Sequence, residues 1–266
     1  MFDIDETIFH FIEDMKYVEN EHVLGAFFYG SYLTGYNENH SDIDILIIFD
    51  NDNPRHLIRG NKYIDGIRIE YFEKPINDIY LTIENEYNSQ NNASLSIIGT
   101  SKILFDKNGS LRKLQDFSLK TFSKPLPPLD LEDAREYVSI LNNRMEKVRK
   151  AAYENSPNFI HLYHLTIEKI RKFYHRLNGL PAVQTSKVYR VYLDEEYRKS
   201  FYKNNIPEKE FVSMYISAIT DITSSIEDKL KKIENLFDYA KRNVILDSNE
   251  YRILIKSRNL NIINKK

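Results

Sequence analysis

Two short stretches in the first fifty residues decide the fold: residues 27–31 read FFYGS and residues 42–48 read DIDILII. The first stretch ends an apolar run, Val23–Tyr29, which predicts a buried strand that leads into a Gly-Ser turn. The second stretch opens with two aspartates and continues as an apolar run to Phe49, which predicts a second buried strand. Residues 34–39 between them supply a helical turn or two, so the order of the elements predicts an α/β domain.

Asp42 and Asp44, which we call the aspartate pair, lie two residues apart on the second predicted strand. Their side chains therefore leave the same face of the sheet, where they repel each other unless a cation lies between them. Hard carboxylate oxygens suit Mg²⁺, which binds one or two protein carboxylates together with substrate phosphates. In the turn, Gly30 lets the backbone approach another group closely, and Ser31 adds a hydroxyl and an N–H group that can hold phosphate oxygens. An isolated Asp-x-Asp is usually only solvated, so the prediction depends on the ordered combination.

A third carboxylate follows in a predicted hairpin. The pair Asp65-Gly66 between two apolar runs is a strong signal for a two-residue hairpin turn. In the strand after it, residues 67–72 read IRIEYF, and alternation places Glu70 on the face opposite the isoleucines. If that face meets the aspartate pair, three carboxylates converge and two metal ions could bind, which would activate the attacking oxygen and stabilise the leaving one. The alternative is that Glu70 is salt-bridged to Arg68.

Together these elements resemble the signature of the polymerase β-like nucleotidyltransferase superfamily: hydrophobic-Gly-Ser, a spacer, then Asp-hydrophobic-Asp-hydrophobic. Gly30-Ser31 and residues 42–45 match this signature, and residues 32–35 and Ser41 match the usual filling of the spacer. The resemblance covers residues 20–110 well. It implies an enzyme that transfers a nucleoside monophosphate from an NTP.

The resemblance also implies roles for the site residues. It implies that Asp42 and Asp44 bind Mg²⁺, as two ions, and that the phosphates of the nucleotide are held by Gly30, Ser31 and Ser41. ATP is the expected donor. The third carboxylate of the family is often Asp, and Glu70 occupies the equivalent strand here. Whether Glu70 is a metal ligand, a general base or both is left open.

The second half of the chain predicts a different architecture. Residues 124–128 read KPLPP, which cannot be regular helix or central strand and predicts a stiff linker. Four later segments have apolar residues at helical spacing and predict a bundle: 131–153, 159–177, 208–220 and 222–242. We therefore expect an α+β protein with a catalytic α/β domain and mixed sheet over 1–124, a linker over 125–129 and a helical domain over 130–266. In the tail, Tyr251–Ile255 could be strand or helix.

Beyond residue 110 the chain is similar, more loosely, to antibiotic nucleotidyltransferases such as those that act on kanamycin or on streptomycin and spectinomycin. In those enzymes a helical domain carries an inward Glu, an Asn-Gly turn, a Pro and a Lys, and this chain has, in that order, Glu168, Asn178-Gly179, Pro181 and Lys187. A mobile lysine charge suits a triphosphate, so Lys187, together with Arg190, is expected to neutralise the leaving pyrophosphate. The alternative for Lys187 is an exposed helix lysine.

Glu168 is a second candidate general base, for which it would have to reach the hydroxyl group of the acceptor. It lies on a segment with helical periodicity, between Ile167 and Lys169. The alternative is a surface glutamate that is paired with Arg171 or Lys172.

Composition narrows the classes of protein. The 266 residues contain no cysteine, which excludes a disulfide framework, Cys-ligated zinc, an iron–sulfur cluster and a Cys nucleophile. No apolar run reaches the ~20 residues of a membrane span, and the acidic N-terminus is unlike a secretory signal, so we expect a cytoplasmic protein without membrane contact. The net charge of −2 argues against a protein that coats nucleic acid. Residues 1–125 carry 12 Lys and Arg against 20 Asp and Glu, so the basic excess lies in the rest.

The expected function is Mg²⁺-dependent transfer of AMP from ATP to a hydroxyl of a small molecule, with release of pyrophosphate. An aminoglycoside-like antibiotic is the favoured acceptor, which would make the protein a resistance enzyme, because a cationic drug suits an acidic catalytic half. One alternative is the same chemistry on an RNA 3′ end or on a protein, as in toxin–antitoxin nucleotidyltransferases. The other alternative is a non-catalytic nucleotide-binding module that regulates another process.

Overall fold

The two apolar runs that flank the Gly-Ser turn are neighbouring strands in the middle of a sheet. β1 (Val23–Tyr29) and β2 (Ile43–Phe49) pair antiparallel, with Tyr29 opposite Asp44. β2 also pairs in parallel with β4 (Ile67–Pro75), which places Glu70 level with Asp44. In the described part of the chain the sheet has five strands in the order β3-β4-β2-β1-β5, so the predicted mixed sheet is confirmed.

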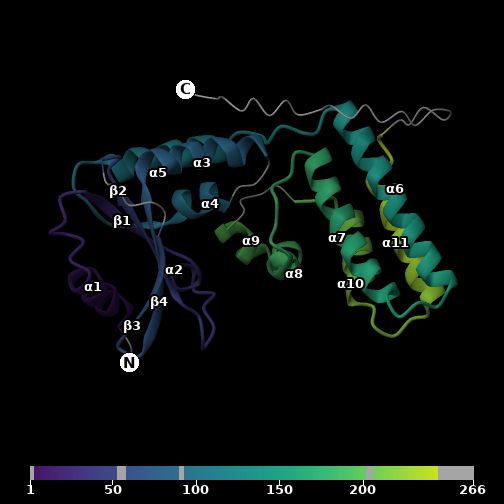
Figure 1. The fold of residues 1–266 in the computed structure, drawn as a ribbon, viewed down its shortest axis with the longest axis horizontal. Coiled ribbons are helices and arrows are strands. Elements are labelled where there is room, and N and C mark those ends of the chain that lie inside the picture. Colours follow the sequence, from purple (N-terminus) through teal and green to yellow (C-terminus); the bar gives the residue numbers. More distant parts are fainter. Residues whose placement is uncertain (1–2, 53–57, 90–92, 202–205, 245–266) are drawn as a thin grey trace, which may run out of the picture. The chain divides into compact units, whose positions relative to one another are not determined.

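The computed structural model describes residues 3–52, 58–89, 93–201 and 206–244. The prediction for Tyr251–Ile255 lies outside these residues. By its internal contacts the chain divides into two units. Figure 1 colours the chain by residue number, so the segments of each unit can be found in it. The first unit consists of Met1–Pro128 and Asn178–Glu208, and the second consists of Leu129–Leu177 and Lys209–Lys266.

The Asp-Gly turn forms the predicted hairpin between β3 (Ile58–Ile64) and β4. Both turn residues have positive φ, +51° for Asp65 and +79° for Gly66, as a tight two-residue hairpin turn requires. The turn fixes the register of the two strands, so that Asn61 lies opposite Glu70 and Arg59 lies opposite Phe72.

Helices cover both faces of the sheet and bury its alternating side chains. On one face α1 (Ile4–Asp14) packs Ile8, Phe11 and Ile12 against the odd-numbered residues of β2. The even-numbered apolar residues of β2 face three helices on the other side: α3 (Ile76–Asn88), α4 (Ala93–Thr100) and α5 (Ser110–Phe122). Each buried aliphatic or aromatic side chain contributes about 1.5–3 kcal/mol to folding. Asp44 shares the second face.

Several helices differ from the sequence-based expectation. The prediction that a helical turn spans residues 34–39 is wrong, because α2 (Ser31–Thr34) starts directly after Gly30 and stops at Gly35, whose φ is +76°. Apolar residues at helical spacing over residues 4–18 predict a longer first helix, but α1 stops at Asp14 because Lys16 has a left-handed backbone with φ +53°. Helices α3 to α5 were not expected. Pro75 provides no side-chain cap for α3, and the apolar residues of α4 do not gather on one face of the helix.

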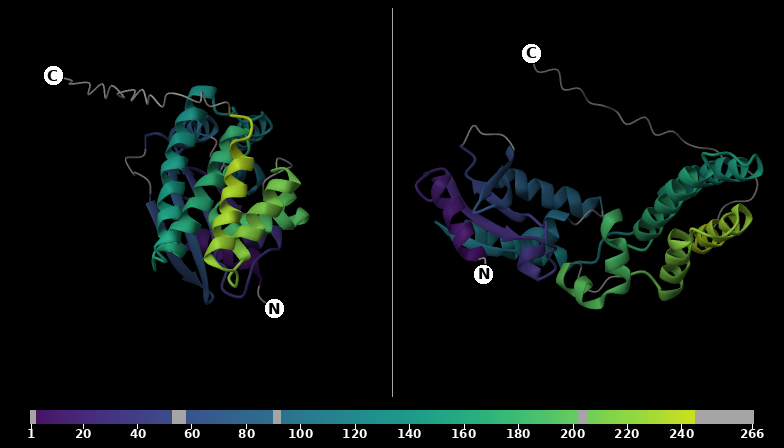
Figure 2. Two further views of the ribbon diagram at one scale, coloured as in Figure 1. Left: turned by 90° about the vertical axis from the view of Figure 1, so that its right-hand side faces the viewer. Right: turned by 90° about the horizontal axis from the view of Figure 1, so that it is seen from below.

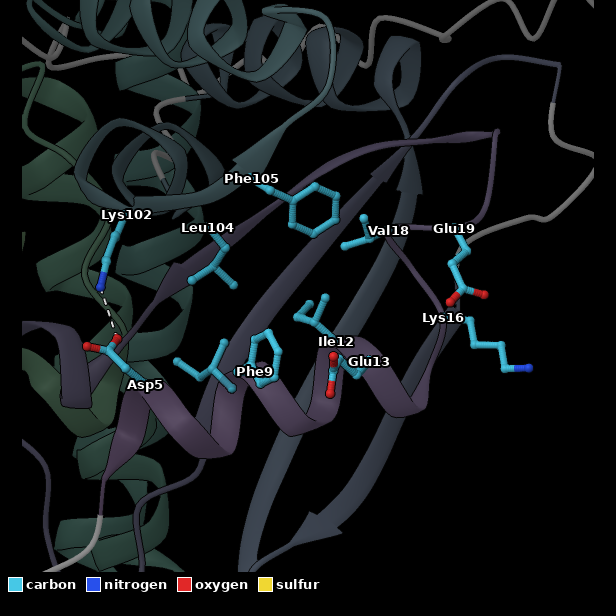
Figure 3. A pocket seen from close by; sticks show the side chains of 11 residues that line it. Asp5, Phe9, Ile12, Glu13, Lys16, Val18, Glu19, Lys102, Leu104 and Phe105 are labelled. Carbon is cyan, nitrogen blue, oxygen red and sulfur yellow. Dashed lines mark hydrogen bonds and ion pairs between the residues drawn. The ribbon is translucent and has the colours of Figure 1, made fainter.

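An apolar groove of about 750 Å³ runs between α1 and the strand β5 (Lys102–Asp106). Figure 3 shows Phe9 and Ile12 on the helix side and Leu104 and Phe105 on the strand side, with the Asp5–Lys102 ion pair (3.0 Å) at one end. The groove lies on the face of the sheet opposite the side chain of Asp44. It is therefore separate from the aspartate pair.

In the described residues the second unit contains four helices, which confirms the predicted bundle: α6 (Leu131–Tyr153), α7 (Phe159–Leu177), α10 (Lys209–Thr220) and α11 (Ile226–Lys241). They run alongside one another in both views of Figure 2. Their facing sides bury a continuous apolar core that includes Val138, Met145, Ile170 and Leu236. The last helix begins at Ile226 rather than Ile222, since Ser225 caps it by accepting a hydrogen bond from Asp228 N–H. Among the described helices, none is both long and apolar enough to cross a membrane.

The segment between α7 and α10 belongs to the first unit, whereas the predicted division assigned it to the helical domain. It carries the 3₁₀ turn Thr185–Lys187, α8 (Val188–Leu193) and α9 (Glu195–Phe201). The Pro-rich stretch also lies in the first unit up to Pro128, and the carbonyl of Pro125 accepts a hydrogen bond from Tyr87 Oη at 2.9 Å.

Asp221 in the α10–α11 connection makes the stability of the second unit sensitive to acid. The ammonium of Lys232 and the hydroxyl of Ser224 both bind its carboxylate and hold its pKa below the ordinary 3.8. A depressed carboxyl pKa stabilises the fold above the unfolded-state pKa, and that stabilisation is lost as the pH falls through the folded-state pKa. Asp221→Asn is therefore expected to lower the midpoint of thermal unfolding at pH 7, by an amount that shrinks below about pH 4. Asp238→Asn, which removes an exposed partner of Lys241, serves as the control and should change little.

Candidate functional site

The Gly-Ser turn meets the aspartate pair because β1 ends where β2 begins. Tyr29, the last residue of β1, is the partner of Asp44 in the ladder, and Gly30 follows it. Gly30 has φ +90° and ψ −161°, a conformation that only glycine adopts readily. A Cβ atom at this position would lie 2.1 Å from Asp44 Oδ2. The glycine is thus required both by the backbone and by the close approach of the carboxylate.

The loop between the turn and β2 is tied together by its own short polar side chains. Thr34 Oγ1 donates to the carbonyl oxygens of Gly30 (3.3 Å) and Ser31 (3.2 Å), which fixes the turn. Ser41 Oγ accepts from Glu38 N–H at 2.8 Å, and Ser41 N–H donates to Glu38 O at 3.0 Å. Ser31 thus follows directly after the glycine that meets Asp44, and Ser41 shapes the loop just before Asp42.

Glu70 lies beside the aspartate pair, as the alternation of β4 predicted. The parallel ladder places it level with Asp44. Its carboxylate is 14% exposed and accepts from Arg59, at 2.5 Å from Nε and also from Nη2. The alternative partner, Arg68, instead donates to Asn61 Oδ1 (3.1 and 3.0 Å) and lies 3.5 Å from Asp42 Oδ2. The alternative, a pairing of Glu70 with Arg68, is therefore not what the structure has: Arg59 pairs with Glu70 and Arg68 with Asp42.

The site is electrostatically strained at its centre. Burial, followed by the negative charges of Glu70 and Asp42, raises the pKa of Asp44 from 3.8 to about 7, and the positive charge of Lys187 opposes this rise. The pKa of the Tyr29 hydroxyl is also raised, by burial and then by Asp44 and Glu70, while Arg59 opposes the rise. Like charges in a partly dry site have this effect, and a bound cation would relieve it.

Carboxylate oxygens from neighbouring strands are the donor chemistry that Mg²⁺ prefers. Among the described residues, however, no group of three or more His, Cys, Asp and Glu side chains is arranged to hold a metal ion. Asp42 and Asp44 fit the two-carboxylate mode in which substrate phosphates complete the coordination. Glu70 points its carboxylate at Arg59, so its part in a metal site stays a prediction.

Lys187 and Arg190 belong to the same unit as the aspartate pair. Lys187 ends the 3₁₀ turn before α8, close enough to Asp44 for its charge to counteract the raised pKa. The guanidinium of Arg190 is ion-paired with Glu38 and lies over the ring of Tyr197 at 5.8 Å. The Tyr197 ring also meets Tyr36 edge to face at 4.9 Å. These contacts attach the α8–α9 segment to the loop before Asp42, and they hold Arg190 at that loop.

Glu168 lies on α7 in the second unit. Its carboxylate accepts from Arg171 at 2.8 Å and 3.3 Å, and from the hydroxyl of Tyr215. Arg171 is 1% exposed, which makes it one of the largest fully buried side chains in the described chain. The pairing with Arg171 that was weighed as an alternative is thus present, and the role of Glu168 as a general base stays a prediction.

Sequence reasoning missed Arg59 and Tyr29. Arg59 could have been found from the hairpin alone, because a two-residue turn at Asp65-Gly66 places residue 61 opposite Glu70 and residue 59 one pleat further along the same face. Tyr29 was assigned only to the apolar run, although its place before Gly30 puts its hydroxyl beside the carboxylates.

Residues 15–110 match the family model described as polymerase beta, nucleotidyltransferase. This segment is similar to the polymerase β-like nucleotidyltransferases. The matched residues contain the Gly-Ser turn, the aspartate pair and Glu70, so the resemblance drawn from the motif is confirmed over residues 15–110. The crystal structure of a nucleotidyltransferase-like protein from Exiguobacterium sibiricum 255-15 is similar over 91% of this chain and 75% of that chain, with a TM-score of 0.49 and 10% identity. No curated protein matches the chain.

Proposed function

We propose that the chain is a Mg²⁺-dependent nucleotidyltransferase that transfers AMP from ATP to a hydroxyl of a small molecule and releases pyrophosphate. The observation that supports this best is the meeting of the Gly30 turn with Asp44, flanked by Asp42 and Glu70, in a nucleotidyltransferase domain. A site that only had to bind a nucleotide would not need to crowd carboxylates until burial and like charges raise the pKa of Asp44 to about 7.

In the proposed reaction the acceptor oxygen bonds to the α-phosphorus and the bond between that phosphorus and the α–β bridging oxygen breaks. Mg²⁺, when bound, supplies positive charge to the triphosphate and to the leaving oxygen. Asp42 and Asp44 would hold it. The backbone of the Gly30-Ser31 turn and the Ser41 loop position the phosphates, and Lys187 neutralises the leaving pyrophosphate, with Arg190 at the neighbouring loop. The hydroxyl proton passes to a carboxylate, for which Glu70 is favoured over Glu168.

The acceptor class is proposed from charge. Residues 1–125 contain 20 acidic against 12 basic side chains, which suits a cationic small molecule such as an aminoglycoside-like antibiotic. An RNA 3′ end would instead need a surface for phosphates, and binding that falls steeply with salt concentration would favour it. A protein hydroxyl is the third acceptor class.

The test is transfer of α-³²P label from each of ATP, GTP, CTP and UTP, with Mg²⁺, to antibiotics, tRNA and purified cell protein. Label on an antibiotic with ATP as donor supports the proposal in full. Label only on RNA or protein would replace the acceptor and leave the reaction class standing. If none of the acceptors becomes labelled but the protein binds a nucleotide tightly, the non-catalytic nucleotide-binding module is favoured.

Lys187→Ala is expected to lower kcat/KM for the nucleotide about tenfold to a hundredfold, since one positive charge on the departing pyrophosphate is removed. Lys187→Arg should keep part of the activity, because the charge remains but its shape and reach change. Lys199→Ala is the matched control on the same segment, where the lysine pairs with Glu195 and Glu196 at the surface. Steady-state rates at varied ATP concentration measure all three, and equal rates for Lys187→Ala and the wild type would remove the lysine from the mechanism.

A further inference from the structure

Arg59 is a cationic side chain bound to the third carboxylate of the proposed site. It comes from β3, binds the carboxylate of Glu70 through Nε and Nη2, and places its guanidinium 5.3 Å from the centre of the Phe72 ring. Its side chain is 64% exposed, whereas that of Glu70 is 14% exposed. The arginine therefore covers a largely buried carboxylate from the solvent side.

The ion pair gives the third carboxylate of the proposed site its own countercharge. Glu70 is level with Asp44 on the neighbouring strand, and its charge raises the pKa of Asp44, yet the three carboxylates form no metal cluster among the described residues. Both Arg59 contacts are made to Oε1 of Glu70. A divalent cation that binds this carboxylate would lie close to the guanidinium, so the two positive charges repel each other and compete for the same negative charge.

The two arginines of the hairpin are held differently. Arg68 donates two hydrogen bonds to the neutral side chain of Asn61 and makes a longer ion pair, 3.5 Å, with Asp42. Arg59 is held by Glu70 itself and by the face of Phe72. The guanidinium of Arg59 is mostly exposed, and a solvated cation of this kind is held weakly enough for a divalent cation with its nucleotide to displace it.

We propose that Arg59 is an exchangeable countercharge: it neutralises Glu70 in the cation-free protein and gives the carboxylate up when a divalent cation binds at the aspartate pair. The inference rests on the proposed function, because it takes the aspartate pair to be a cation site. It adds that Glu70 offers its full negative charge to the cation only after Arg59 leaves, so the arginine lowers the affinity of the empty site for cations.

The test measures Mn²⁺ binding to the full-length protein without nucleotide, from the electron paramagnetic resonance signal of free Mn²⁺. Arg59→Ala is expected to bind Mn²⁺ about three- to fivefold more tightly than the wild type, the factor that corresponds to loss of one exposed ion pair. Arg59→Lys keeps the charge without the planar fork and should give a smaller gain. Lys62→Ala is the matched control, since Lys62 is a cation of the same strand that pairs with Asp14 instead, and its affinity should stay at the wild-type value.

A double variant separates competition for Glu70 from a general effect of removing positive charge. Glu70→Gln should weaken Mn²⁺ binding, and Arg59→Ala in that background should give no further gain. If Arg59→Ala tightens binding equally with and without Glu70, or does not tighten it at all, the exchange is ruled out. If the wild type binds no Mn²⁺, or if Asp42→Asn binds it as tightly as the wild type does, the cation site of the proposed function is contradicted, and this inference with it.

Discussion

Asp44→Asn is expected to lower nucleotidyl transfer at least about a thousandfold, and Asp42→Asn by a similar factor. The amide keeps the shape of each side chain but removes the negative charge that would bind Mg²⁺, and about 4 kcal/mol of transition-state stabilisation corresponds to a thousandfold. The rate of transfer of label from α-³²P-ATP measures the loss. Undiminished transfer in both variants would refute the enzymatic proposal.

For stability, Asp44→Asn is expected to have the opposite effect to that on activity. Measuring stability therefore shows whether a loss of activity comes only from unfolding of the variant. Asp44 is partly buried beside two other carboxylates, and these surroundings disfavour its charge. A neutral asparagine removes that repulsion, so Asp44→Asn should unfold at the same or a higher temperature than the wild type at neutral pH without added cations. A variant that is inactive and also less stable would show that the carboxylate has a structural role not seen in its contacts.

Asp50→Asn is the matched control for the aspartate pair. Asp50 follows directly after β2, at the opposite end of that strand from Asp42, and it pairs with His22 at 3.1 Å. Asp50→Asn changes the net charge of the first unit by the same amount as Asp44→Asn, but it leaves the aspartate pair intact. Activity within about twofold of the wild type is expected, since exposed pairs contribute at most about 1 kcal/mol.

The central part of the site was predictable because it depends on local geometry. The period of two in residues 42–48 and 67–72 fixes the face of each carboxylate, and the Asp65-Gly66 turn fixes the register of the hairpin. The parallel pairing of β2 with β4 could not be predicted from the local pattern, because it joins segments that are separated along the chain. That pairing is what places Glu70 directly opposite Asp44 in the ladder.

The parts that sequence reasoning assigned differently depend on tertiary contacts. The segment with Lys187 lies between two predicted helices, so it was grouped with the helical half. In the structure, Arg190 and Tyr197 contact Glu38 and Tyr36 of the first unit. Long-range contacts of this kind have no periodic signature. Similarly, the sequence did not show that Glu70 pairs with Arg59 rather than with Arg68. In the folded hairpin, Arg68 instead donates to Asn61.

Gly30→Ala is expected to reduce activity at least about a hundredfold and to destabilise the first unit by about 1–3 kcal/mol. The alanine would be strained at φ +90°, and its Cβ would lie 2.1 Å from Asp44 Oδ2, so the carboxylate would have to move out of its place between Asp42 and Glu70. Loss of the close approach also shifts the turn that is proposed to hold the phosphates. Transfer rates and chemical denaturation measure the two effects.

Gly35→Ala separates backbone strain from displacement of the carboxylate. Gly35 also has positive φ, +76°, but a Cβ there would meet no atom within 4 Å. A left-handed alanine costs about 1–2 kcal/mol, so Gly35→Ala should lose comparable stability while keeping activity within about fivefold of the wild type. If both variants lose activity equally, strain in the loop and not the position of Asp44 limits the reaction. If only Gly30→Ala is inactive, the glycine is retained because the phosphate turn and the aspartate pair must lie closer together than any side chain permits.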